Sequence, residues 1–317
     1  MRIRSSIKSL CKHLHRHRKI QADIFIFTLP RAGSTLLAEI LNTDPSTKTA
    51  SEPLALNRDN LQVLRRYFSR DFPGERYVDI SENDLLNMFS YFEDLSSGKT
   101  WNSYYWSDLS SGFHHFLSRR TLFKTHRLSY YFEEFMQHFK EDFGLYLLRH
   151  PVSHALSRMR KGWDPYSELY AESEKIRILL NEEAKLKTQD VIASGSQLEQ
   201  FVLSWCLENY VFIHGLQNGS LPGNMFPVFY EELVTSPEKT IRDICGKVNM
   251  EYNDRMLSRL QIPSSGIVHS TEEAEAQIKA GNADYLTQRW RQDINESDTE
   301  KVKDILRKLG ITIYKDF

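Results

Sequence analysis

Short apolar runs alternate with longer amphipathic segments along the chain. Runs rich in β-branched and aromatic residues follow Asp23 and Thr121, and others span 144–148 and 226–230; a short strand is also expected at 47–50. Runs of this length and composition are typical of buried strands. Because helical patterns separate most of them, we predict an α/β fold in which helices cover both faces of a central, mainly parallel sheet.

Helical periodicity predicts the elements between the strands. The first helix should run from about Thr35 to Asn42, where a breaker sequence ending in Pro45 stops it. Further helices are expected from a capping box at Ser81–Asp84 to about Leu95, at 166–194, at 198–216, at 238–250, and after a capping box formed by Ser297 and Glu300. Within 198–216, core packing explains Trp205 and Tyr210 best.

Residues 58–119 are expected to form a helical and aromatic insertion. The end of this segment is dense in aromatic and ionisable side chains, namely Trp101, Tyr104, Tyr105, Trp106, Asp108, His114 and His115. Two interpretations fit. The side chains form a packed lid, or they form rigid walls around a small polar or cationic acceptor. We prefer the second.

Composition limits the class of protein. With 317 residues and 40% hydrophobic content, the chain can bury a sizeable core, and residues 21–317 are expected to form one domain. The formal net charge of −1 gives no reason to expect a nucleic-acid partner. Cys11, Cys206 and Cys245 are odd in number and lack metal-ligand spacing, so neither a disulfide framework nor a zinc site is expected. A reducing, cytoplasmic location fits best.

Residues 1–20 carry ten Lys, Arg or His side chains. They contain no apolar run as long as a secretory core or a membrane span, so we expect neither an export signal nor a transmembrane segment. We interpret them as a solvated basic tail. The alternatives are an organelle address or a membrane-surface arm, since Ile3, Ile7, Leu10 and Leu14 fall roughly on one helical face.

Gly33, Ser34 and Thr35 connect the first predicted strand to the first helix. Backbone N–H groups and hydroxyls at a helix N-terminus bind anions, so this turn is a candidate anion site. The plainer alternative is a turn in which Ser34 or Thr35 only caps the helix. The nucleotide-binding pattern G-x-x-x-x-G-K-[ST] is not met, because the first glycine is missing and Arg31 stands where the pattern needs no arginine. A nucleoside triphosphatase is therefore disfavoured.

The hexapeptide Pro30-Arg31-Ala32-Gly33-Ser34-Thr35 resembles the phosphosulfate-binding loop of the PAPS-dependent sulfotransferases, whose pattern is Pro-(Lys/Arg)-(Ser/Ala)-Gly-(Ser/Thr)-Thr. Downstream, Arg149 ends the strand at 144–148, and Ser157 follows eight residues later. In that family an arginine and a serine with this spacing bind the 3′-phosphate of PAPS, which suits the fork-shaped guanidinium. The family's usual Arg-Asp-Pro is Arg149-His150-Pro151 here, a departure at the middle position.

Two further segments support the resemblance, which covers roughly 22–57, 121–161, 197–250 and 282–310. Tyr230-Glu231-Glu232-Leu233 with Pro237 is similar to the family's Tyr-Glu-Asp-Leu…Pro element, which implies that Tyr230 lies near the nucleotide. Arg289-Trp290-Arg291 resembles the C-terminal segment, where an arginine either closes over the cofactor phosphates or lies on the surface. The resemblance implies a P-loop NTPase-like fold, PAPS as co-substrate and no metal. The cofactor-binding residues that it implies are Arg31, Ala32, Gly33, Ser34, Thr35, Arg149, Ser157 and Tyr230.

Two residues are candidates for the general base. Glu52 follows the strand at 47–50, where one sulfotransferase subfamily places its catalytic glutamate. Lys124-Thr125-His126 is similar to the triplet of the cytosolic sulfotransferases, in which the histidine is the base. Histidine accepts a proton near neutral pH without perturbation, whereas glutamate needs burial to raise its basicity. We prefer Glu52, because it and the Arg31 loop follow one subfamily pattern together.

The resemblance therefore implies a sulfotransferase that moves the sulfuryl group from PAPS to a hydroxyl or amine of a small-molecule, glycan or lipid acceptor and releases PAP. Arg31 would neutralise the charge that grows on the bridging oxygen. Two other functions stay open. One is a P-loop kinase or NTPase-like phosphotransferase, and the other is a non-catalytic anion-binding module on the same fold.

Overall fold

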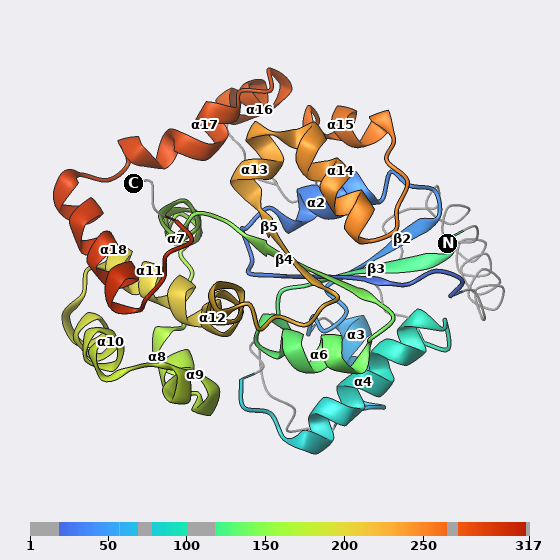
Figure 1. Cartoon of the computed structure of the whole chain (residues 1–317), viewed down its shortest axis with the longest axis horizontal. Coiled ribbons are helices and arrows are strands. Elements are labelled where there is room, and N and C mark those ends of the chain that lie inside the picture. The colour runs from blue at the N-terminus through green and yellow to red at the C-terminus, as the bar shows by residue number, and fades with distance from the viewer. Residues whose placement is uncertain (1–18, 57, 69–77, 101–117, 265–271, 315–317) are drawn as a thin grey trace.

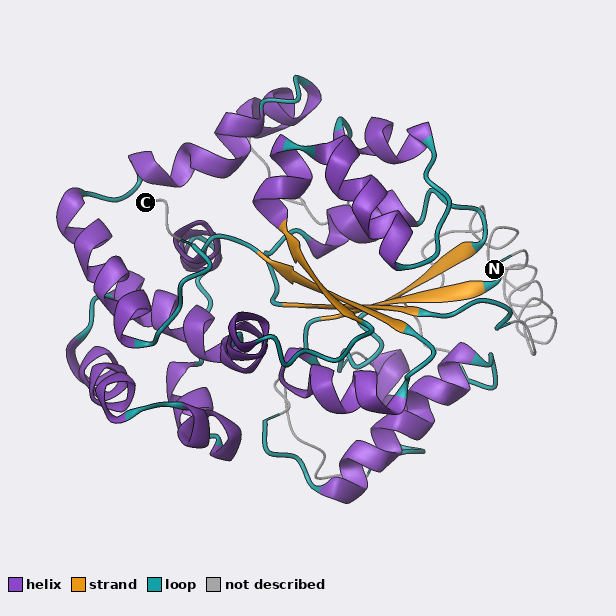
Figure 2. Ribbon diagram, in the orientation of Figure 1, coloured by secondary structure: helices purple, strands orange, loops and turns teal. Residues whose placement is uncertain are grey.

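The computed structural model describes residues 19–56, 58–68, 78–100, 118–264 and 272–314. A five-stranded sheet in the order β2-β3-β1-β4-β5 forms its centre, and every strand pairing is parallel (Figures 1 and 2). The strands are β1 Ile24–Thr28, β2 Thr47–Ser51, β3 Arg120–Thr125, β4 Phe143–Leu148 and β5 Met225–Phe229. The predicted α/β class is confirmed.

Both faces of the sheet are apolar, because alternate residues of a strand point to opposite faces. Ile24 and Ile26 of β1 lie in one buried cluster, and Phe25 and Phe27 lie in another. The first cluster packs beneath α2 Ser34–Leu41, α13 Tyr230–Thr235, α14 Pro237–Lys247 and α15 Asp254–Leu260. On the opposite face lie α3 Arg58–Leu64, α4 Glu82–Ser96, η2 Ser129–Tyr131 and α6 Phe132–His138.

The remaining helices form a lobe beside β4 and β5, on the left in Figure 1. It contains α7 Pro151–Met159, α8 Ser167–Ala171, α9 Glu174–Leu179, α10 Glu182–Ser194, α11 Gln197–Glu208, α12 Tyr210–Asn218 and α18 Glu296–Lys308. Between α15 and α18 the chain forms α16 Glu272–Lys279, α17 Ala283–Gln288 and η3 Arg289–Gln292. Trp205 and Tyr210 are 1% and 7% exposed, which confirms the prediction that they pack in the core.

Three helix predictions needed correction. The segment 166–194 folds as three helices, because buried side chains such as Ile176 tie separate turns to the core. The segment 198–216 is divided at Asn209, whose side-chain amide donates to the backbone carbonyl of Trp205. The capping box before α18 consists of Asn295 and Asp298, which places Ser297 inside the first turn. Asparagine caps a helix as well as serine does, so the sequence pattern did not distinguish Asn295 from Ser297.

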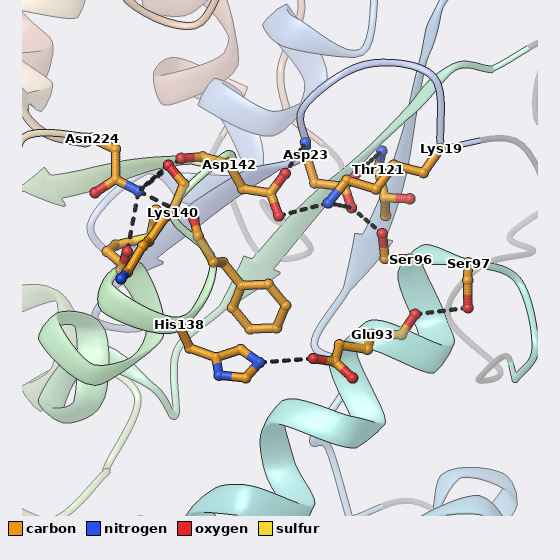
Figure 3. A network of polar contacts seen from close by, with 12 residues as sticks. Lys19, Asp23, Glu93, Ser96, Ser97, Thr121, His138, Lys140, Asp142 and Asn224 are labelled. Atoms are coloured by element: carbon orange, nitrogen blue, oxygen red, sulfur yellow. Dashed lines mark hydrogen bonds and ion pairs between the residues drawn. The ribbon is translucent and has the colours of Figure 1, made fainter.

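A polar network fixes the amino ends of three strands (Figure 3). Asp23 precedes β1 and is 1% exposed, and its carboxylate accepts from the backbone N–H of Thr121 at 2.6 Å and from the hydroxyl of Ser96. Asp142, just before β4, accepts from the backbone N–H of Asp23 at 2.8 Å and pairs with Lys19 at 2.7 Å. This network lies at the edge of the sheet opposite to the predicted site, so its role is to hold the strands together.

A buried ion pair fixes α7, the helix that carries Ser157. Arg158 and Glu208 have fully buried side chains, with 2.5 Å between Nη1 and Oε1. Ser204 donates to the same carboxylate at 2.7 Å, and Arg158 also donates to the carbonyl of Asp164 at 3.0 Å. Both charges are therefore compensated within the lobe.

Glu208→Ala should lower the free energy of unfolding by about 3–5 kcal/mol, because the Arg158 guanidinium would stay buried without its carboxylate. Urea unfolding followed by circular dichroism measures this change. As a control, Glu238→Ala breaks an exposed pair with Arg242 and should leave the midpoint nearly unchanged. Similar shifts in the two variants would contradict the role given to the buried pair.

Candidate functional site

The predicted site residues come together at the carboxyl edge of the sheet. Because all five strands are parallel, their carboxyl ends lie at one edge, which is where such sheets bind ligands. Arg31 follows β1, Glu52 follows β2, His126 follows β3, Arg149 follows β4, and Tyr230 follows β5. Residues separated by up to two hundred positions in the sequence are thereby neighbours.

The turn after β1 has the backbone of an anion cradle. Arg31 has a φ of 76° and Gly33 a φ of 101°, and α2 begins at the next residue, Ser34. A left-handed backbone conformation is strained at a non-glycine residue, and residues in such conformations cluster at functional sites. Gly33 is required for a second reason, since an added Cβ would lie 2.5 Å from Cδ2 of Tyr230. The Tyr230 ring therefore closes one side of the turn.

Gly33→Ala should destabilise the protein by about 1–3 kcal/mol, because alanine is strained at this φ and its methyl group would collide with the Tyr230 ring. The matched control is Gly246→Ala. Gly246 lies in α14, and beyond its own stretch of helix no heavy atom lies within 4 Å of an added Cβ. Gly246→Ala should leave the stability of the protein unchanged or raise it slightly. Thermal unfolding compares the two variants, and an unchanged midpoint for Gly33→Ala would contradict the close approach.

Two arginines and a serine converge beside this turn. Nη1 of Arg149 donates to the carbonyl of Arg31 at 3.1 Å, and Nε of Arg31 donates to Oγ of Ser157 at 3.2 Å. The Arg149 guanidinium lies over the Tyr230 ring, 4.7 Å from its centroid. Burial, and then the charge of Arg149, lower the pKa of Arg31. An anion bound between the two guanidinium groups would relieve their repulsion.

A sharp turn directs Glu52 towards the end of β3. Its backbone N–H donates to the carbonyl of Lys124 at 2.8 Å, which extends the β2–β3 ladder, and its φ of 48° then turns the chain away. The carboxylate accepts from the backbone N–H of His126 at 3.2 Å. Its other oxygen lies 3.0 Å from Nδ1 of His126 and 3.4 Å from Nζ of Lys124. The side chains of Glu52 and His126 are 18% and 19% exposed.

These contacts set the charge of Glu52. Burial raises the pKa of the carboxyl group, but His126 and Lys124 outweigh burial and lower that pKa to about 2. Glu52 is thus ionised at neutral pH. A carboxylate this close to Nδ1 favours the tautomer of His126 that carries its proton on Nδ1, which leaves the lone pair on Nε2. Nε2 lies 3.0 Å from Oγ of Ser34.

A family model described as the sulfotransferase family matches residues 23–254, which span the sheet and every residue of this site. The chain belongs to the sulfotransferase family. A search of curated proteins finds no match in sequence. In the part of this sulfotransferase that the structure describes, no helix is both long and apolar enough to cross a membrane.

Several solved sulfotransferase structures are similar to this one. The sulfotransferase domain of the Synechococcus PCC 7002 olefin synthase is 16% identical, with a TM-score of 0.49, and 94% of this chain and 98% of that chain are covered. The sulfotransferase domain from the curacin biosynthetic pathway is also 16% identical, with a TM-score of 0.49 and coverages of 93% and 100%. Mouse sulfotransferase SULT7A1, solved in complex with PAP, is 14% identical, with a TM-score of 0.47 and coverages of 96% and 90%.

His150 stands where the sequence pattern of sulfotransferases usually has aspartate. Its backbone N–H donates to Glu231 at 2.8 Å, and its ring stacks on Trp290 with 4.3 Å between centroids. Burial, followed by the charges of Arg291 and Arg149, lowers the pKa of His150 to about 3, so the ring is neutral. Sequence reasoning missed the role of Trp290, which anchors η3 beside the end of β4. The only signal for it was an aromatic residue between two arginines.

Two further groups of residues were singled out in the sequence. Arg289 and Arg291 are exposed and donate hydrogen bonds to Tyr285 and Gln288, respectively, which places both on the surface. The aromatic and ionisable side chains between Trp101 and His115, expected to form acceptor walls, lie outside the described residues. The basic tail does too, apart from Lys19 and Ile20.

Proposed function

We propose that this sulfotransferase moves the sulfuryl group from PAPS to a hydroxyl or amine of a small-molecule, glycan or lipid acceptor and releases PAP. The observation that carries the proposal is the convergence of the Arg31 turn with Arg149 and Ser157, beside the Glu52–His126 pair. A cationic cradle next to a proton acceptor is what metal-free transfer of an anionic group needs. A cytoplasmic location is part of the proposal.

Each element of the cradle has a role in this proposal. The backbone N–H groups of Gly33, Ser34 and Thr35 hold the 5′-phosphosulfate at the start of α2. Arg149 and Ser157 bind the 3′-phosphate, and Tyr230 flanks the nucleotide. The bond between sulfur and the bridging phosphate oxygen breaks, and Arg31 neutralises the charge that develops on that oxygen. The acceptor oxygen or nitrogen forms the new bond to sulfur and gives up its proton.

We assign His126 as the general base that takes this proton, and Glu52 as the residue that positions His126. The sequence pattern favoured Glu52. The contacts favour His126, because its Nε2 lies against the anion turn while both oxygens of Glu52 contact the end of β3. A carboxyl group whose pKa is lowered to about 2 is also a weak base. In the reaction, the Glu52 charge stabilises the imidazolium that forms.

Arg149→Ala should weaken PAP binding by about 10- to 100-fold, because a charge-assisted contact to the 3′-phosphate is lost. Adenosine 5′-phosphate lacks that phosphate and should bind the variant and the wild type almost equally. Isothermal titration with the two ligands makes the comparison. An equal loss for both would show that Arg149 supports the turn rather than the 3′-phosphate.

Transfer of radiolabelled sulfate from PAPS, screened over alcohols, phenols, amines, glycans and lipids, tests the proposed function. Labelled product with at least one acceptor class, together with equimolar PAP, is expected. PAP release without labelled product would indicate hydrolysis, and PAP binding without any release across the panel would favour the non-catalytic module.

A further inference from the structure

The hydroxyl of Ser34 connects the anion turn to the Glu52–His126 pair. Ser34 is the first residue of α2 and is 3% exposed. Its Oγ lies 3.0 Å from Nε2 of His126, and the next hydroxyl, that of Thr35, lies 3.5 Å from Nζ of Lys124. Both hydroxyls of the turn therefore contact the end of β3.

The direction of the Ser34 contact follows from the other side of the imidazole ring. Nδ1 of His126 faces the ionised Glu52 at 3.0 Å, so in the neutral imidazole that a base requires the ring proton is on Nδ1. Nε2 is then an acceptor, and the Ser34 hydroxyl is the donor. A serine hydroxyl has one proton, so it cannot donate to His126 and to an anion in the turn at the same time.

We propose that Ser34 is a positioning residue whose hydroxyl changes its hydrogen-bond acceptor. It donates to His126 in the free protein and to the anionic group of the nucleotide in the complex, so that His126 meets the acceptor only after the nucleotide has bound. This inference rests on the proposed function. The exchange is favourable because a hydrogen bond to a charged group is roughly twice as strong as one between neutral groups. Once the hydroxyl turns to the anion, Nε2 accepts from the acceptor O–H or N–H instead. No covalent bond changes in this step.

In this proposal, His126 and PAP compete for the hydrogen bond that the Ser34 hydroxyl donates. Removing the imidazole should therefore tighten PAP binding. We expect His126→Ala to lower the Kd of PAP by about three- to tenfold, the range that the net strength of one neutral hydrogen bond gives. In the Ser34→Ala background the same His126→Ala change should alter the Kd less than twofold. The remote control His138→Ala, which alters an exposed ring stacked on Phe89, should leave PAP binding unchanged.

Isothermal titration of the four proteins with PAP completes this double-mutant cycle, and no turnover is needed. Ser34→Thr keeps a hydroxyl and should keep the coupling to His126. If His126→Ala is poorly folded, His126→Phe removes Nε2 while keeping a ring. An unchanged or weaker PAP affinity on removal of His126, or an equal change in the Ser34→Ala background, would overturn the proposal. Absence of PAP binding by the wild type would instead refute the proposed function itself.

Discussion

His126→Asn should reduce turnover by about 10² to 10⁴ while PAP still binds. Asparagine keeps a polar side chain of similar reach, but it cannot take up a proton. The acceptor would then have to lose its proton to water as the sulfur–oxygen bond forms. Measuring kcat and KM separately matters, because loss of an ordinary contact to the acceptor would chiefly raise KM.

Glu52→Gln is the matched comparison for this variant. It keeps the shape of the side chain and removes the charge beside Nδ1 and Lys124. In our assignment Glu52→Gln lowers turnover less than His126→Asn does. The imidazole can still accept the proton, but no carboxylate charge stabilises the imidazolium that forms. If Glu52→Gln is inactive while His126→Asn turns over almost normally, the glutamate is the direct base and the preference from sequence was right.

Arg31→Ala should lower turnover by about 10² to 10³, with a much smaller loss of PAP affinity. Arg31 lies before Gly33 in the turn and its Nε donates to Oγ of Ser157 at 3.2 Å, so it stands between the two elements that we propose to bind the nucleotide. Its charge matters most when the bridging oxygen becomes negative, a state that PAP binding alone does not contain. Arg149 still has the backbone carbonyl of residue 31 as its partner in this variant.

Arg31→Lys is the control for charge, and we expect it to recover part of the lost turnover because the family pattern has either lysine or arginine at this position. Turnover at saturating PAPS within about a factor of two of wild type in Arg31→Ala would mean that the residue is structural. A drop in PAP affinity as large as the drop in turnover would move its role from the transition state to binding.

The sequence predicted much of the sheet and of the cradle, because both depend on local patterns. Most strands contain a short apolar run bounded by turn residues, and the turn at Arg31 and Gly33 has a fixed spacing. Parallel strands then place all their following residues at one edge, whatever the strand order. This is why Arg149, Ser157 and the Arg31 turn could be expected to meet before the structure was known.

Other features depend on strand order and on single side chains, which local patterns do not record. The contact of Ser34 with His126 exists because β3 lies next to β1. The assignment of the base depends on the φ of Glu52 and on what its oxygens contact, neither of which follows from a Ser-Glu-Pro sequence. The stacking of Trp290 on His150 joins residues that no motif connects.

The central claim is that the cradle at the carboxyl edge of the sheet binds the bisphosphate nucleotide PAP. Thermal unfolding of the wild-type protein with PAP, compared with ATP plus Mg²⁺, tests it most directly. PAP at a hundredfold its Kd should stabilise the protein by about 2.7 kcal/mol and raise the midpoint clearly, while ATP with Mg²⁺ should have little effect. A midpoint raised by ATP with Mg²⁺ and unmoved by PAP would contradict the account and point to a phosphotransferase.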